Sequence, residues 1–159
     1  MTRRLAAAAL LALLLPLVDA ASAAATEDTC TQQSRRVRMP SGFAEARVSF
    51  AGVLTSGRTR VGEYFPGGDV REIRIAVSWT DLERVHHQRL ELYSPDGSLY
   101  QRFSATFTGD RRAVSTVTAL PVAGSSISDA GLYGEWCAEV FLDDEEAPIA
   151  RRHFELTPP

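Results

Sequence analysis

Apolar side chains recur at every second position over four stretches of this chain, which lie within residues 73–79, 90–92, 99–107 (where Gln101 interrupts the pattern) and 136–142. Alternation with a period of two predicts strands with one buried face and one wet face, as in antiparallel sheets. The predicted inward positions are Ile73, Ile75, Val77 and Trp79; Leu90 and Leu92; Leu99, Phe103, Ala105 and Phe107; and Trp136, Ala138, Val140 and Leu142. After residue 26, no segment sustains the spacing of a long amphipathic helix.

Turn sequences separate these stretches at the intervals of an all-β domain. Ser94-Pro95-Asp96-Gly97 has the Pro and Gly positions of a type I turn, and the acidic segment 143–148 precedes a last predicted strand at 149–156. Further strands at 46–53 and 114–120 bring the total to about seven. The sequence therefore predicts an all-β fold, an immunoglobulin-like antiparallel β-sandwich.

The order of turns and strands also resembles that of secreted bacterial sandwich domains of the immunoglobulin-like or fibronectin-III-like type. The features that carry the resemblance are Tyr64-Phe65-Pro66-Gly67-Gly68-Asp69, Tyr93-Ser94-Pro95-Asp96-Gly97, Gly134-x-Trp136-x-x-x-Val140-x-Leu142-Asp143 and Ile149-Ala150-x-x-x-Phe154-x-Leu156. The resemblance covers residues 45–157 and implies a scaffold whose Gly-x-Trp strand forms the last hairpin with the terminal strand. The resemblance implies no catalytic, cofactor-binding or metal-binding residue.

A second similarity concerns the tyrosine corner of antibody-type domains, which the segment Asp129-Ala130-Gly131-Leu132-Tyr133 resembles. In those domains the cysteine lies two residues beyond the tyrosine. Here Cys137 lies four residues beyond Tyr133, which departs from the spacing that accompanies their inter-sheet disulfide.

The first 25 residues have the features of an export signal. Arg3 and Arg4 precede an apolar stretch at 5–18, and small residues at 20–25 offer cleavage sites. The apolar stretch is short for a membrane span, which needs about 20 residues. We therefore predict a cleaved signal peptide and a periplasmic or secreted protein without a membrane span after cleavage. A retained single-span anchor is the alternative.

The domain organisation follows from these boundaries. We expect the signal peptide at 1–25, an N-terminal arm at 26–43 and one β-sandwich domain at 44–159, in which residues 54–69 form a loop.

Composition narrows the source and the partners. The chain has 159 residues, a net charge of −3 and 23% charged residues, which excludes a strongly basic nucleic-acid-binding protein. All 17 basic residues are Arg, and Lys and Asn are absent. This usage is typical of a GC-rich bacterial genome, so we expect a bacterial protein that binds no nucleic acid.

Cys30 and Cys137 are expected to form a disulfide, because exported proteins meet an oxidising compartment. Cys137 shares the predicted wet face of its strand with Glu139, so the arm is expected to cross the outer face of the sheet over Phe141 and to be tied there. Two free thiols for metal or redox chemistry are the alternative, which neither a C-x-x-C pair nor a nearby His supports.

His86 and His87 lie beside Asp81 and Glu83 and form the densest group of candidate metal ligands. Adjacent residues of a strand point to opposite faces, so these histidines can share a metal only if a turn forms at 82–85. The competing interpretation is a solvated loop between the strands that end at Trp79 and begin at Leu90, with His153 elsewhere on the surface.

Other motifs are equally unspecific. The run Asp143-Asp144-Glu145-Glu146 lacks a calcium-loop pattern and is interpreted as a charged hairpin tip. No G-x-S-x-G nucleophile elbow occurs, and a carboxylate pair would be set by geometry alone. We therefore predict no catalytic residues, no cofactor and no metal.

Exposed aromatic rings are the remaining candidates for binding. Tyr93 and Tyr100 flank the 94–97 turn on the predicted polar face, and Tyr64 and Phe65 lie in the predicted loop. The sequence predicts a non-enzymatic module for protein interaction or structural support in the cell envelope, which contacts an unidentified envelope protein through sheet edges or loops. A carbohydrate- or polymer-binding module is the alternative, and a small secreted hydrolase is a third.

Overall fold

The computed structural model describes residues 30–40, 42–110 and 113–159 and builds them almost entirely from strands. The long strands are β3 (Gly42–Leu54), β6 (Val70–Thr80), β7 (Glu83–Tyr93), β8 (Leu99–Asp110), β9 (Val114–Pro121), β10 (Gly134–Leu142) and β11 (Ala150–Thr157). The short elements are β1 (Gln33–Ser34), β2 (Val37–Met39), β4 (Thr59–Val61), β5 (Tyr64–Pro66) and α1 (Ser126–Ala130). The predicted signal peptide lies outside the described residues.

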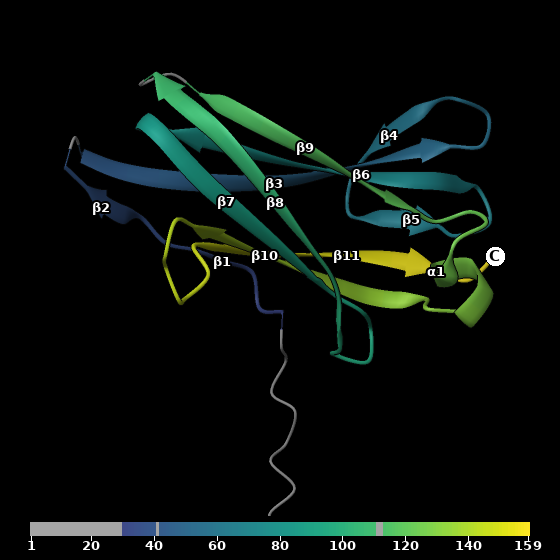
Figure 1. The fold of residues 1–159 in the computed structure, drawn as a ribbon. Coiled ribbons are helices and arrows are strands. Elements are labelled where there is room, and N and C mark those ends of the chain that lie inside the picture. Colours follow the sequence, from purple (N-terminus) through teal and green to yellow (C-terminus); the bar gives the residue numbers. More distant parts are fainter. Residues whose placement is uncertain (1–29, 41, 111–112) are drawn as a thin grey trace, which may run out of the picture.

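The seven long strands form two facing sheets (Figure 1). The larger sheet has the order β11-β10-β7-β8, and the smaller has the order β3-β6-β9, with antiparallel neighbours throughout. This is the predicted immunoglobulin-like sandwich. In constant-type immunoglobulin domains the fourth strand lies beside the fifth, whereas here the fourth long strand, β8, pairs with the third, β7. The free edges of β8 and β9 therefore lie on the same side of the sandwich.

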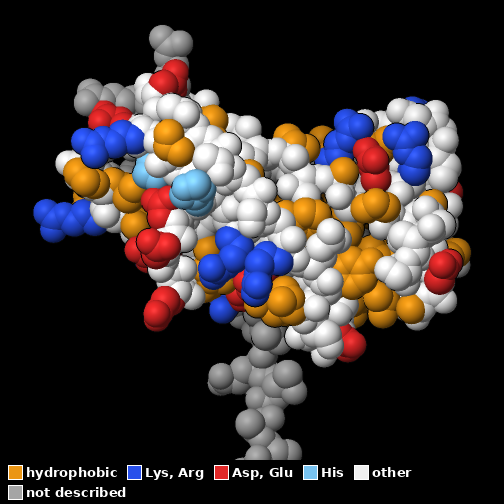
Figure 2. Space-filling model, viewed as in Figure 1, with side chains coloured by type: hydrophobic (Ala, Val, Ile, Leu, Met, Phe, Trp, Pro, Cys, Tyr) orange, Lys and Arg blue, Asp and Glu red, His pale blue; other side chains and the backbone are white. Residues whose placement is uncertain are grey.

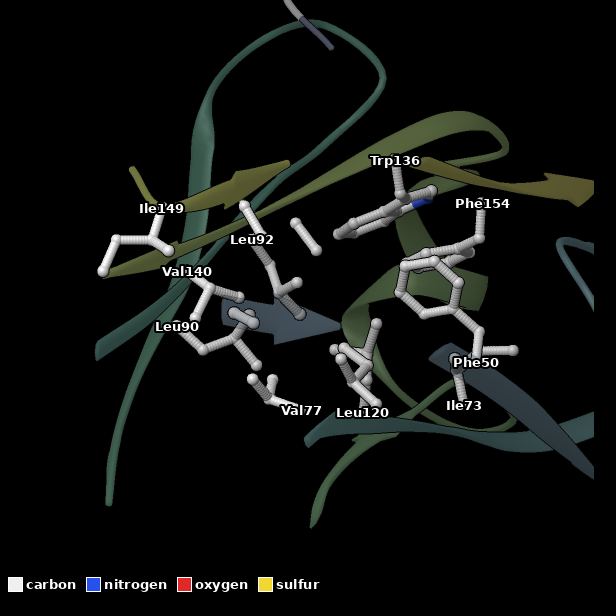
Figure 3. Packing of buried hydrophobic residues seen from close by; sticks show 14 of the residues in the cluster. Phe50, Ile73, Val77, Leu90, Leu92, Leu120, Trp136, Val140, Ile149 and Phe154 are labelled. Atoms are coloured by element: carbon white, nitrogen blue, oxygen red, sulfur yellow. The ribbon is translucent and has the colours of Figure 1, made fainter. Parts of the chain in front are cut away.

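The core fills the space between the sheets, and the alternation of β6 and β10 predicted its members correctly. The inward residues of these two strands are at most 1% exposed. At one end of the core, Trp136 stacks on Phe154 with ring centres 6.0 Å apart, and Phe50 of the other sheet lies 5.0 Å from Phe154 (Figure 3). These rings join the two sheets, and their burial contributes to the stability of the fold together with the rest of the core.

A register shift in β8 overturns the predicted faces at its start. Tyr93 pairs with Leu99, and the preceding residue, Leu92, pairs with Gln101, so Tyr100 is the extra residue. Such a bulge exchanges the two faces of a strand. Leu99 is consequently 46% exposed instead of buried, whereas the ring of Tyr100 packs edge-on against Trp136 at 5.0 Å.

The predicted solvated loop between the Trp79 and Leu90 strands is wrong, because β6 and β7 are joined directly by Asp81 and Leu82. The inward face of the first half of β7 carries polar side chains, which hid the strand from a search for apolar alternation. Gln88 is buried there, and its Oε1 accepts hydrogen bonds from Trp79 Nε1 at 2.7 Å and from Thr116 Oγ1 at 2.8 Å.

The predicted loop at 54–69 also contains structure. β4 pairs with β3, and β5 lies parallel to β11. Phe65 of β5 is fully buried against Phe154 instead of being exposed. A Cβ on Gly52 would lie 2.7 Å from the Phe65 ring, so the glycine allows β5 to lie this close to β3. An isolated glycine within a strand often marks such an approach.

The arm is partly built into the sandwich. β1 pairs with β11 of the larger sheet, and β2 pairs with β3 of the smaller sheet. Arg35, between them, donates to the backbone oxygens of Pro148 and Ala147 and forms an ion pair with Glu145 at 2.5 Å. The acidic hairpin tip is thus held by the arm.

Candidate functional site

Two carboxylates meet at the centre of the outer face of the larger sheet. Glu91 of β7 lies directly opposite Glu139 of β10. Their residues are only 5% and 7% exposed, although the alternation predicted a wet face here. Like charges directly opposite each other destabilise a strand pair, so this arrangement requires compensating cations.

Glu91 receives most of the compensation. Its Oε1 accepts a hydrogen bond from Arg102 Nε at 2.7 Å, and its Oε2 accepts one from the Tyr93 hydroxyl at 2.8 Å. Arg89 Nε lies 3.1 Å from Oε1 without hydrogen-bond geometry. Glu91 is therefore held by strands β7 and β8 together.

The charge of Glu139 is compensated by the strand on its other flank, β11. Arg151 Nε of β11 donates to Glu139 Oε1 at 2.6 Å. Beside this pair, the Arg89 guanidinium lies 4.0 Å from the centre of the Phe141 ring, which is buried. A cation over an aromatic face is favourable, and it covers an apolar side chain on an outward-facing position.

These contacts set the protonation states of Glu91 and Tyr93. Burial raises the pKa of Glu91, but hydrogen bonds from Tyr93 and Arg102 lower it by more. The positive charges of Arg102 and Arg89 act in the same direction, so the pKa lies below its ordinary value. Burial, the hydrogen bond to Glu91 and the charge of Glu139 raise the pKa of Tyr93 to about 12.

A carboxyl group that acts as a general acid needs a pKa near the working pH. Glu91 instead stays ionised at neutral pH, and an arginine lies on each side of the Glu91–Glu139 pair. The two carboxylates form a structural ion cluster, which links β8 through β7 and β10 to β11.

The disulfide lies on the same outer face. Cys30 is joined to Cys137, with their Cα atoms 5.4 Å apart, as the sequence predicted. A small cavity of about 190 Å³ next to it is lined in part by Tyr93 and Glu135. His153 lies opposite Cys137 in the register; it is half-buried, and its Nδ1 has no hydrogen-bond partner, so it is not the surface residue that was expected.

His86 and His87 lie on a strand and point to opposite faces. His86 is buried, with Nδ1 2.8 Å from Asp143 Oδ2 and Nε2 2.7 Å from the Glu83 carbonyl oxygen. His87 is exposed, with Nδ1 3.0 Å from Thr106 Oγ1, and its backbone N–H donates to Asp143 Oδ1. Asp143 thus joins both histidines. Within the described ranges, no three His, Cys, Asp or Glu side chains are placed to hold a metal ion.

The four candidate aromatic residues do not form one surface. Tyr93 lies over the ion cluster, whereas Tyr100 packs against Trp136 on the other face and its hydroxyl lies 2.6 Å from Ser126 Oγ, so the two rings do not pair. Tyr64 is 60% exposed and Phe65 is buried beside it.

The two sides of the sandwich differ in how their edges are covered. On the side that we call the covered side, β1 and β5 lie along β11, and β2 and β4 lie along β3. Arg152, on the same strand face as Phe154, forms an ion pair with Glu63. A groove of about 700 Å³ remains between β3 and β11, and Glu45 and Arg47 are among the residues that line it.

On the other side, β8 and β9 have no further strand partner among the residues that the structure describes; we call these two unpaired edges the open edge. β8 carries no charge from Phe103 to Gly109, and β9 carries none at all. Val117 of β9 is 64% exposed. In Figure 2 the surface over these strands is mostly white, whereas blue and red side chains gather below it and at the ends of the molecule.

Comparisons with known proteins assign this chain to no family. No protein-family model matches the chain, and no curated protein matches it. Among solved structures, the chain is similar to an immunoglobulin-like protein from Pseudomonas aeruginosa, with 16% identity, 70% of this chain and 96% of that chain covered, and a TM-score of 0.34. The fold assignment rests on the sheet topology, to which this similarity adds no argument.

Sequence reasoning named sheet edges in general but missed which edge stays open and missed the ion cluster. The charge-free runs of β8 and β9 are visible in the sequence, yet only the topology shows that both strands lie at an edge.

In the described part of the chain, no helix is long and apolar enough to cross a membrane.

Proposed function

We propose that this chain is an exported, non-enzymatic β-sandwich module of the bacterial cell envelope, which binds a protein partner through its open edge. The observation that carries the proposal is the absence of charge along the free edges of two neighbouring strands, from Phe103 to Gly109 and from Val114 to Pro121. Sheet edges ordinarily carry charges, prolines or short covering strands that prevent pairing with other chains. Pro121 stands only at the end of β9, and the uncharged length of the open edge before it is suited to accept a strand from a partner.

Two further features support an exported module. The disulfide between Cys30 and Cys137 suits an oxidising compartment. On the outer face, Glu91 and Glu139 are each bound by arginine, so this carboxylate pair is not free to act as an acid–base pair.

The test compares two exposed valines of edge strands on opposite sides. A photo-activated cross-linking residue replaces Val117 of the open edge, and in a control chain it replaces Val61 of the covered side, which is 77% exposed. Both chains are exported in the source organism and irradiated. We expect discrete protein adducts from position 117 and none from position 61. The same adducts from both positions, or none from either, would contradict the proposal.

A further inference from the structure

We propose that the open edge binds a second copy of this chain, through antiparallel pairing of β8 with β8 of that copy about a twofold axis at Thr106. This inference rests on the proposed function, because it names the partner that the edge accepts. Twofold pairing of identical surfaces is the commonest way in which soluble proteins form oligomers.

The charges of β8 select the register. Arg102 and Asp110 are the only charged residues of this strand, and Thr106 stands midway between them. Both lie on the outer face, because Arg102 pairs with the outward Glu91 and residues of the same parity share a face. When two copies of β8 run antiparallel about Thr106, Arg102 of each copy lies directly opposite Asp110 of the other. A shift of the axis along the strand removes both matches.

The same register matches large side chains with small ones. Phe103 then faces Gly109 of the second copy, and Phe107 faces Ala105, on the inward face of the sheet. Gly109 is needed within its own chain, since a Cβ there would lie 2.5 Å from the Leu82 carbonyl oxygen. Gly109 is already buried beside Leu82 of its own chain, so the size match that supports this register is that of Phe107 with Ala105.

The two phenylalanines also explain why this edge gains from a partner. Phe103 and Phe107 pack against the core but are only half-buried, at the rim where the smaller sheet ends. A second copy of β8 alongside them covers part of this apolar surface, which is favourable.

Both charged ends of β8 lie at the surface of the molecule. The Arg102 side chain is 55% exposed, and its Nε donates to Glu91 while the guanidinium has further N–H donors. Asp110 is exposed at the other end of the strand. Pairing from Arg102 to Asp110 joins the two larger sheets into one continuous sheet. β9 has no charged residue that would fix a register, so β8 is the strand to which we assign the contact.

Cysteine substitutions test the register directly in the purified, disulfide-bonded protein. Thr106→Cys places one thiol opposite its own copy at the axis, within the range that a disulfide spans between directly opposite strand residues. Ser104→Cys and Thr108→Cys lie opposite each other, so each alone is separated from its own copy. We expect Thr106→Cys to give a dimer under mild oxidation, and an equal mixture of Ser104→Cys and Thr108→Cys to give a mixed dimer.

A charge reversal provides a second measurement that needs no new thiol. Asp110→Arg puts like charges opposite each other at both ends of the pairing, and it should weaken self-association in sedimentation equilibrium by about tenfold. Asp69→Arg, an exposed residue in the turn after β5, is the matched control and should leave association unchanged.

The outcomes separate this inference from the proposed function. A wild-type protein that stays monomeric at all concentrations, or cross-linking of Ser104→Cys alone as readily as Thr106→Cys, overturns the pairing of β8 with itself. If position 117 then still gives adducts with another protein in cells, the binding edge stands and only the second copy is wrong. Failure of both experiments removes both proposals.

Discussion

The two sides of this sandwich have opposite edge chemistry although they belong to the same two sheets. On the covered side, four short strands lie along β3 and β11, and Arg152 and Glu63 form an ion pair there. On the open side, β8 and β9 run without a further strand partner in the described residues, and most of their length is uncharged. Because one chain protects one side and leaves the other bare, we infer that the bare side is kept free for a partner.

The ion cluster connects the two sides. Arg102 of β8 binds Glu91, Glu91 lies opposite Glu139, and Glu139 is bound by Arg151 of β11. Buried ion pairs are weak evidence for stability, because desolvation costs about as much as the attraction provides. Their value here is that they hold β8 in place at the edge of the sheet while it lacks a partner on its far side.

The largest effect is expected from removal of the disulfide, which breaks the covered side. The double variant Cys30→Ser/Cys137→Ser frees the arm and, with it, β1 along β11. The closed loop has a sequence separation of 107 residues. The chain-entropy model gives about 4–5 kcal/mol for such a loop, and often less is observed.

Urea unfolding of the wild type and of this variant, with and without reductant, measures the loss. Reductant should bring the wild type to the midpoint of the variant and leave the variant unchanged. Equal midpoints for the oxidised wild type and the variant would contradict a stabilising role of the disulfide.

The open side depends on a buried polar contact instead of a covalent one. Gln88→Leu removes the acceptor of Trp79 Nε1 and Thr116 Oγ1, which joins β7 to β6 and β9. A buried donor left without a partner costs about 1–3 kcal/mol, so the free energy of unfolding should fall by that amount. Thr116→Val is the matched control with a smaller loss, since Trp79 keeps its acceptor. An equal loss in both variants would contradict this assignment.

Tyr93→Phe tests the hydrogen bond between Tyr93 and the ion cluster. The hydrogen bond to the ionised Glu91 should contribute about 1.5–3 kcal/mol at neutral pH. The pKa of Tyr93 is raised to about 12, so its contribution is fully present below about pH 10 and is lost as the pH rises toward 12. Unfolding curves between pH 8 and pH 12 should therefore converge for the wild type and the variant. A difference in the free energy of unfolding that stays constant over this pH range would contradict the stabilising role of the Tyr93–Glu91 hydrogen bond.

Glu91 gives the complementary result in acid. Its pKa lies below the ordinary value near 4.5, so it stabilises the fold above that value, and this contribution is lost as the pH falls through the folded pKa. The stability difference between the wild type and Glu91→Gln should shrink between pH 6 and pH 3. Parallel pH profiles of the two proteins would show that Glu91 makes no such contribution.

The smallest effect is expected at the exposed ion pair of the covered side. Arg47 Nε lies 3.8 Å from Glu45 Oε1, and the Arg47 side chain is largely exposed. Arg47→Ala should change the free energy of unfolding by less than about 0.5 kcal/mol. It should also leave self-association unchanged, in contrast to Asp110→Arg. A loss of self-association in Arg47→Ala would contradict the assignment of self-association to the open edge.

The sequence predicted the fold where one strand face is uniformly apolar. β6 and β10 were located correctly for this reason, whereas the start of β7 was missed because Gln88 and His86 occupy its inward positions and bond to other buried groups. The face of Tyr100 was wrong because one extra residue in β8 reverses the alternation. Neither feature has a signature in a single strand, since each depends on the neighbouring strand.

The disulfide was predictable from composition and from the face of Cys137, and the structure confirms the pairing. The ion cluster was not, because the opposition of Glu91 and Glu139 follows from the register between β7 and β10. The candidate binding pairs Tyr93–Tyr100 and Tyr64–Phe65 were chosen as exposed aromatics, and burial of Phe65 depends on the parallel placement of β5 along β11.

The central claim is that the open edge pairs with a second copy of this chain and that the covered side does not. Amide hydrogen exchange of the disulfide-bonded protein, measured by mass spectrometry at low and at high concentration, tests it most directly. The account predicts that exchange slows with concentration in peptides from residues 102–110 and stays constant in peptides from residues 150–157. Exchange that is independent of concentration in both segments, or equal slowing in both, would contradict it.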